Sequence, residues 1–136
     1  MHDPGFKLVR DFMITNPICA ELWQPLSFIR QNMLVNAFSY LPVKVSQNGD
    51  HCWKVVSDRA LAAYIRDSLP QEQRVRLAQT LSNAVENGHL ELEVVDVKDG
   101  QTPLSEVIKR VSHLPILVSN GSTSNLTGIL TAHDLL

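Results

Sequence analysis

Three residues near the end of the sequence could bind a small anionic molecule: Gly128, Thr131 and Asp134. The short apolar run from Gly128 to Leu130 precedes Thr131, and this pattern predicts a strand that turns into a helix. A hydroxyl and a carboxylate three residues apart lie on the same side of a helix's first turn. Free amide hydrogens and the positive end of the helix dipole point to that side too. This corner could therefore hold a phosphate through its amides and a sugar through its carboxylate.

The same spacing has a second interpretation, because Thr-x-x-Asp is also a capping pair. In that role Thr131 accepts a hydrogen bond from a backbone amide and Asp134 accepts one in return. Such pairs open many helices. The spacing leaves both roles open, and a degraded copy of the pattern earlier in the chain favours the ligand-binding role.

Length and composition limit the chain to one domain, or to two very small ones that share a core. It has 136 residues, a formal net charge of −2 and 44% hydrophobic residues, which predicts a packed core. No basic cluster indicates nucleic-acid binding, and no apolar run reaches the roughly 20 residues that span a bilayer. The first residues lack the features of a signal peptide. Two cysteines in apolar surroundings, Cys19 and Cys52, indicate reduced residues of a cytoplasmic protein.

Apolar periodicity and turn residues predict an alternation of helices and strands. We expect helices at 6–14, 25–34, 57–67, 70–87 and 103–111, and a last one from Thr131 onward. We expect strands at 18–20, 40–45, 52–56, 90–97, 114–118 and 126–130. The helix at 70–87 begins at a proline, ends at Asn87-Gly88 and is expected to lie on the surface.

The two halves of the sequence repeat each other. Each half reads strand, helix, strand, turn, strand, helix, and neither is long enough to bury both faces of a three-stranded sheet alone. We therefore expect the two halves to pack together. The matching segments are 24–27 with 102–105, 39–43 with 112–116, and 57–61 with 131–135.

The element order, the Ser-x-Leu-Pro-[Val/Ile] strand and the terminal Gly-x-x-Thr-x-x-Asp resemble a tandem pair of cystathionine-β-synthase (CBS) domains, a Bateman module. The resemblance covers about residues 12–67 and 91–136. It implies an α+β fold of two β-α-β-β-α repeats packed as a pseudo-twofold pair, with an additional linker helix between them. The implied parts are 1–67, the linker helix at 68–90, and 91–136. The last helix of the family is cut short here, so we expect the chain to be part of a longer protein.

The resemblance implies a non-catalytic regulatory sensor that requires no cofactor. Such a sensor binds an adenosine-containing nucleotide (AMP, ADP, ATP or S-adenosylmethionine) between the repeats and transmits occupancy to a partner or an attached domain. Asp134 would accept from the ribose hydroxyls, Thr131 would contact phosphate or sugar, and His133 could approach a phosphate. Ile129, next to Gly128, would supply apolar contact. The base would lie against residues of the lead-in and the second strand: Thr15, Asn16, Pro17, Ile18, Ser39, Tyr40 and Pro42.

The other cleft departs from the family's pattern. Lys54 replaces the glycine and Ala60 replaces the carboxylate, while Ser57 remains. Losing the group that pairs with two ribose hydroxyls should cost about 1–3 kcal/mol, so we expect one competent site at most. Lys54 and Arg59 leave open an anionic ligand bound without a ribose contact, although ordinary surface charge is the favoured explanation of both residues. The remaining residues of this degenerate second cleft are Val95, Asp96 and His113.

Two other functions compete with ligand sensing. Catalysis is not expected, because the five histidines are scattered and no His-x-x-Glu-His or Cys-x-x-Cys spacing suggests a metal site. A ligand-free scaffold that dimerises and binds a partner protein remains open, and the amphipathic helix at 70–87 favours it. Family pairs commonly dimerise, which implies a homodimer with the helices 25–36, 57–67 and 103–111 near the interface. Neither nucleic acid nor a membrane is expected as a partner.

Overall fold

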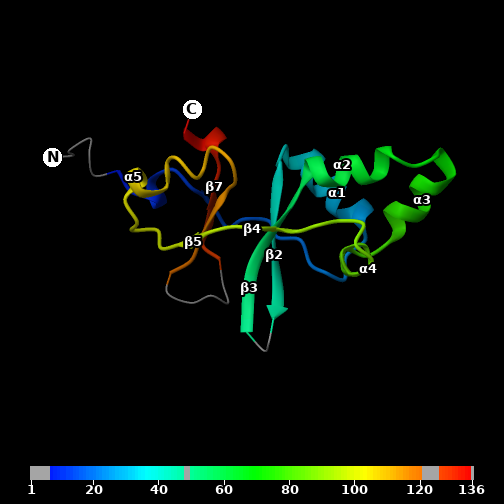
Figure 1. The fold of residues 1–136 in the computed structure, drawn as a ribbon. Coiled ribbons are helices and arrows are strands. Elements are labelled where there is room, and N and C mark those ends of the chain that lie inside the picture. Colours follow the sequence, from blue (N-terminus) through cyan, green and yellow to red (C-terminus); the bar gives the residue numbers. More distant parts are fainter. Residues whose placement is uncertain (1–6, 48–49, 121–125, 136) are drawn as a thin grey trace. The chain divides into compact units, whose positions relative to one another are not determined.

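The computed structural model describes residues 7–47, 50–120 and 126–135, and it has an α+β fold with two compact units (Figure 1). Unit 1 comprises residues 1–17, 47–53 and 95–136. Unit 2 comprises residues 18–46 and 54–94. Unit 1 therefore combines segments from the beginning and the end of the sequence with residues 47–53, and unit 2 is built from the rest of the middle.

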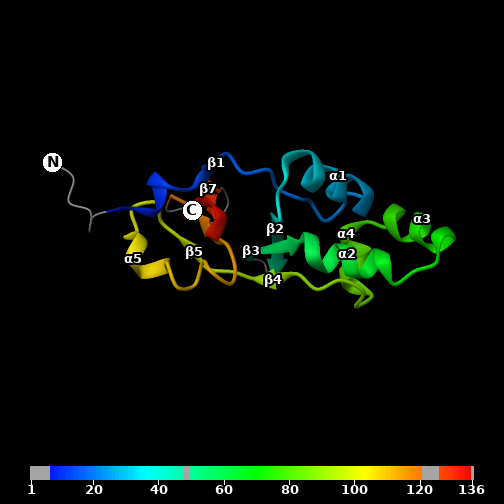
Figure 2. The same ribbon diagram turned by 90° about the horizontal axis from the view of Figure 1, so that it is seen from above.

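Unit 2 contains four helices on one side of a three-stranded sheet (Figure 1, Figure 2). The strands β2 (Tyr40–Gln47), β3 (Asp50–Ser57) and β4 (Glu93–Val94) follow the order β2-β3-β4. The helices are α1 (Leu26–Asn36), α2 (Asp58–Arg66), α3 (Pro70–Ala78) and α4 (Leu81–Glu86). Strands β3 and β4 are antiparallel, with Lys54 opposite Val94.

The core of unit 2 depends on the apolar side of α1. Leu26, Ile29 and Met33, which the i, i+3 and i+7 spacing places on one side of a helix, are buried. The helix ends at Ala37, which has left-handed backbone angles (φ 56°), and the Phe38 amide donates to the Met33 carbonyl at 2.9 Å. This arrangement satisfies one of the last carbonyls of the helix, although alanine adopts such angles at a cost.

Unit 1 contains a four-stranded sheet in the order β1-β7-β6-β5. Its strands are β1 (Ile14–Thr15), β5 (Val97–Lys98), β6 (Ile116–Val118) and β7 (Gly128–Leu130). Strand β5 is parallel to β6, and the other pairs are antiparallel. Helix α5 (Leu104–Val107) and the short 3₁₀ helices η2 (Val9–Asp11) and η3 (Ala132–Leu135) complete the unit. The buried cluster consists of Val9, Leu104, Val107, Val111, Ile116, Val118 and Leu130.

The internal repeat is visible in the topology of the two sheets. In each, a short strand (β1 or β4) pairs with the last strand of a repeat (β7 or β3). The residue after a proline also makes matching backbone contacts in both units. The Leu26 amide donates to the Gln79 carbonyl at 2.8 Å, and the Leu104 amide donates to the Lys7 carbonyl at 2.8 Å. The repeat inferred from the sequence is therefore present in the fold.

The single helix predicted for 70–87 is wrong, because the structure has two helices there, α3 and α4. Backbone groups at the break pair with the segment before α1. The Gln79 carbonyl accepts from Leu26, and the Leu81 amide donates to the Gln24 carbonyl at 2.9 Å. The Thr80 hydroxyl then caps α4. Leu81 is buried, so α4 belongs to the core and is not a surface helix.

Three other predicted elements also differ in extent. The strand expected at 90–97 is divided into β4 and β5, which belong to different sheets. The lead-in helix expected at 6–14 is a 3₁₀ turn followed by β1, and the helix expected at 103–111 has only one regular turn, α5. Asn48-Gly49, a pair that favours a tight turn between two strands, and most of the polar loop expected at 120–125 lie outside the described residues.

Candidate functional site

Gly128 is required by the close approach of the lead-in strand. It pairs with Thr15 across β1 and β7. A Cβ placed on Gly128 would lie 2.5 Å from the Met13 sulfur and 2.9 Å from the Ile14 carbonyl oxygen. Both distances are shorter than van der Waals contact. The group that approaches this glycine in the structure is therefore the chain's own backbone and Met13.

The predicted hydroxyl–carboxylate pair is formed at the start of η3. One oxygen of Asp134, Oδ2, accepts from the Thr131 amide at 2.8 Å and from the Thr131 hydroxyl at 3.1 Å. The Asp134 amide donates to the Thr131 carbonyl at 3.1 Å. This is half of the expected capping pair, because Asp134 accepts from the Thr131 amide while the Thr131 hydroxyl acts as a donor. No described residue bonds to the other carboxylate oxygen, Oδ1.

Unit 1 brings part of the predicted base-binding segment to the same strand. Thr15 lies opposite Gly128, and Ile14 lies opposite Ile129. The Asn16 amide donates to the Thr127 carbonyl at 3.3 Å. Asn16 has a positive φ of 50°, which asparagine tolerates better than most residues.

Exposure differs among the residues at this corner. The side chains of Thr15, Asn16 and His133 are exposed, and Asp134 is half-buried. Pro17, the last residue of this predicted segment in unit 1, is half-buried. The corner therefore presents exposed polar groups beside a partly shielded carboxylate.

The other predicted base-binding residues belong to unit 2: Ile18, Ser39, Tyr40 and Pro42. Two of their backbone carbonyls already have partners. The Pro42 carbonyl accepts from the Ala20 amide, and the Ser39 carbonyl accepts from the Asp58 amide, each at 2.8 Å. Ile18 and Ser39 have exposed side chains, whereas Pro42 is buried.

The equivalent corner of unit 2 has the backbone geometry but lacks the carboxylate. Ser57 accepts from the Ala60 amide at 3.1 Å and so caps α2. Lys54 pairs with Val94 on β4, in the place that Gly128 and Thr15 occupy in unit 1. Since Ala60 has no polar side chain, Ser57 is the remaining polar group of the motif.

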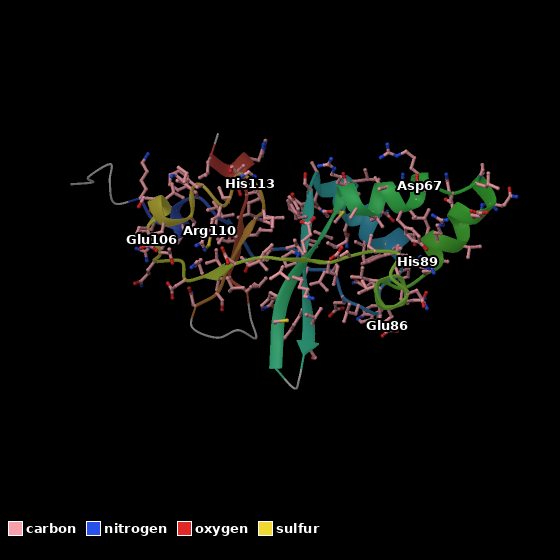
Figure 3. The ribbon with its side chains drawn as sticks, in the orientation of Figure 1. Asp67, Glu86, His89, Glu106, Arg110 and His113 are labelled. Carbon is pink, nitrogen blue, oxygen red and sulfur yellow. The ribbon has the colours of Figure 1, made fainter. Side chains whose placement is uncertain are left out.

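The predicted second-cleft residues of unit 1 include an acidic group that is already paired. Asp96 Oδ2 lies 2.8 Å from Nη1 of Arg110. Arg110 is labelled in Figure 3. This ion pair places a cation against the carboxylate. The neighbouring Val95 is half-buried, and His113 and Arg59 have exposed side chains.

Among the described residues of unit 2, Cys19 has a shifted pKa. Burial raises the pKa of its thiol, and the negative charge of Glu21 raises it further. No three His, Cys, Asp or Glu side chains gather in a metal-binding arrangement among residues 7–47, 50–120 and 126–135. Over the same residues, no helix combines the length and the apolar character needed to cross a bilayer.

Sequence reasoning missed a polar and aromatic cluster in unit 2. The rings of Tyr64 and His89 stack with centroids 5.4 Å apart, and the Arg76 guanidinium lies 4.7 Å above the Tyr64 ring. These residues come from α2, α3 and the segment after α4. Their spacing in the sequence fits no helix or strand period, so no local pattern predicts the cluster.

Comparison with known proteins identifies the fold. Residues 93–136 match the family model of the CBS domain. No curated protein sequence matches the chain. The CBSX2 protein of Arabidopsis thaliana, crystallised in complex with AMP, is 19% identical with a TM-score of 0.63, and the match covers 94% of this chain and 92% of that one.

Two further solved structures share the fold. The CBS domain pair of protein MJ0100, crystallised with 5′-methylthioadenosine and S-adenosyl-L-methionine, is 16% identical with a TM-score of 0.67, over 96% of this chain and 93% of that one. A CBS domain-containing protein from Bacillus anthracis is 16% identical with a TM-score of 0.70, over 95% of this chain and 89% of that one. The chain thus has a CBS domain at residues 93–136 and, over nearly its whole length, the fold of a tandem CBS pair, a Bateman module.

Proposed function

We propose that this chain is a non-catalytic regulatory module that binds an adenosine-containing nucleotide at the Thr131–Asp134 corner. The observation that carries the proposal is the state of the Asp134 carboxylate. Its Oδ2 is fixed by the Thr131 amide and hydroxyl, while no described residue bonds to Oδ1. A half-shielded carboxylate held in this way can accept from the hydroxyls of a ribose without first being ordered.

The structural relatives support an adenosine compound as the ligand. CBSX2 was crystallised with AMP, and the MJ0100 pair was crystallised with two adenosine derivatives. Among the predicted residues, Thr15 and Asn16 lie beside Gly128 and are exposed. We propose a single competent site, because Ala60 of the first repeat occupies the position that Asp134 has in the second repeat.

The test is a thermal-shift scan of the purified protein with AMP, ADP, ATP and S-adenosylmethionine, because a ligand that binds the native state raises the melting temperature. Asp134→Asn keeps one oxygen that can accept from Thr131 but removes the charge. We expect a concentration-dependent shift with one of these compounds in the wild type and about a tenfold loss of affinity in the variant.

Ala60→Asp is the matched variant at the equivalent position of the other repeat. It should leave binding at Asp134 unchanged. If no adenosine compound shifts the melting temperature at millimolar concentration, or if Asp134→Asn binds as tightly as the wild type, the ligand proposal fails. The ligand-free scaffold would then be the better explanation of the fold.

The partner proposed for either function is a second copy of the chain, bound through α1 and α2. The outer side of α1 carries Phe28, Leu34 and Val35, all exposed, and Val35 is 74% exposed. A small hollow lined by Arg30 and Asp58, among other residues, lies between α1 and α2, so charges of both signs are present on these two helices. A two-fold contact needs a self-complementary surface of this kind.

Light scattering after gel filtration tests this assembly. Leu34→Glu should convert a dimer to a monomer, because it places two buried charges in the contact. Leu69→Glu, an exposed leucine before α3, is the matched control and should leave the dimer intact. A wild-type monomer at micromolar concentration would refute this part of the proposal.

A further inference from the structure

A groove in unit 2 is lined by residues of α2, α3 and the segment after α4. His89 of that segment is labelled in Figure 3. The volume of the groove is about 590 Å³, which is within the range of small-molecule sites. Tyr64, His89 and the α3 residues Glu72, Val75 and Arg76 are among the lining residues. All of these residues belong to unit 2, so the groove is independent of the Thr131–Asp134 corner in unit 1.

The cation of this groove is held in place before any ligand binds. Arg76 Nη1 donates to the Tyr64 carbonyl at 2.6 Å, and its guanidinium lies above the Tyr64 ring. Glu72 lies 3.8 Å from Nη2. These contacts leave several of the five N–H donors without a partner in the described residues, and the side chain is 28% exposed. A planar, oriented guanidinium is suited to a carboxylate.

The groove also contains two aromatic rings. The rings of Tyr64 and His89 stack on each other, with an angle of 10° between their planes. The Tyr64 hydroxyl donates to Gln79 Oε1, which fixes the ring. His89 is exposed, and Val75 is 68% exposed on the facing helix. Because His89 and Arg76 both lie against the Tyr64 ring, a flat ligand ring could stack on the exposed imidazole of His89 and cover the valine.

The charges in the groove select the charge of the ligand. Arg76 supplies one positive charge, and the nearby Glu72 would repel a second negative charge on the ligand. A monoanion suits this balance better than a phosphate dianion. We propose that the groove formed by Tyr64, Arg76 and His89 binds a planar aromatic carboxylate, with the ring on His89 and the carboxylate on Arg76.

Benzoate is the probe for this site, titrated into the full chain and followed by two-dimensional amide NMR. We expect millimolar affinity, with shifts concentrated in residues 64, 70–79 and 89. Cyclohexanecarboxylate, which carries the same charge on a ring that is not flat, and inorganic phosphate should each bind more weakly. Equal shifts with phosphate would overturn the aromatic part of the proposal.

Variants separate binding from a purely structural role of the cluster. Arg76→Gln should weaken benzoate binding about tenfold. Arg74→Gln, an exposed arginine of the same helix outside the groove, removes the same charge and should have no effect. His89→Ala removes an exposed ring and should also weaken benzoate binding. The site can therefore still be tested with this variant if Arg76→Gln destabilises α3.

The absence of benzoate shifts in the wild type, or an equal loss in Arg74→Gln, would refute the site. Asp134→Asn should not change benzoate binding, because Asp134 belongs to unit 1. Failure of this site would therefore leave the proposed nucleotide site untouched, and failure of the nucleotide site would leave this one untouched.

Discussion

Replacing Gly128 with alanine should destabilise unit 1 by about 2 kcal/mol. The added methyl group would lie 2.5 Å from the Met13 sulfur, 2.9 Å from the Met13 Cγ and 2.9 Å from the Ile14 carbonyl oxygen. Met13 can change its rotamer, but the Ile14 carbonyl is part of the paired backbone of β1 and β7. Overpacking of this kind costs about 1–3 kcal/mol, and the fixed carbonyl places the effect in the middle of that range.

Urea unfolding followed by circular dichroism measures the effect. With a urea dependence of about 2 kcal/mol per molar, the midpoint should fall by about 1 M. A double-mutant cycle with Met13→Ala then tests the cause. Two of the three close contacts disappear in that background, so Gly128→Ala should cost about 1 kcal/mol less there.

Gly88→Ala is the matched control for the cycle. Gly88 has a φ of 73°, and no atom lies within 4 Å of the position that an added methyl group would take, so its cost of about 1 kcal/mol comes from the backbone alone. That cost should be the same with and without Met13. A cost below about 0.5 kcal/mol for Gly128→Ala, or no coupling to Met13, would refute the steric explanation.

Three further predictions concern unit 2. Because its pKa is raised, the Cys19 thiol should alkylate more slowly at pH 8 than a free thiol, and Glu21→Gln should speed the reaction. Folding favours the neutral thiol, so its contribution to stability is complete below the unfolded pKa of about 8.5. That contribution is lost as the pH rises through the pKa of the folded state. Cys19→Ala should therefore reduce the fall of the urea midpoint over this pH range. Ala37→Gly should raise the free energy of unfolding by about 0.5–1 kcal/mol, because relief of left-handed strain exceeds the added unfolded-state entropy, and a lower midpoint would contradict this. Ser57→Ala should cost about 1 kcal/mol by removing the cap that accepts from Ala60, whereas Ser57→Asp should retain most of the stability.

Local patterns predicted the parts of the fold that depend on neighbouring residues. The buried stripe of α1 follows from the spacing of Leu26, Ile29 and Met33, and the start of α2 follows from Ser57. The internal repeat and the Ser-x-Leu-Pro strands were sufficient to predict the fold. These signals are short in range, and a sequence displays them directly.

The failures have a common physical cause, which is pairing between distant segments. No residue pattern between 70 and 87 predicts that the Gln79 carbonyl accepts from the Leu26 amide, a contact that interrupts the helix. The apolar run at 90–97 likewise gives no sign that its two halves join different sheets. At the candidate site, the pairing of Thr131 with Asp134 was predictable from their spacing. The direction of their hydrogen bond and the role of Met13 beside Gly128 were not.

The pairing of β1 with β7 has a consequence during synthesis. Residues 18–94 contain all of unit 2, so its sheet and helices can form once Val94 has left the ribosome. Strand β1 is synthesised first, yet its partner β7 ends at Leu130, 36 residues after Val94. At about 5–20 residues per second, β1 waits roughly 2–7 s without a partner while unit 2 is already able to fold. The earliest strand of the chain is thus among the last to be paired, and a nascent-chain chaperone would find Ile14 exposed throughout that interval.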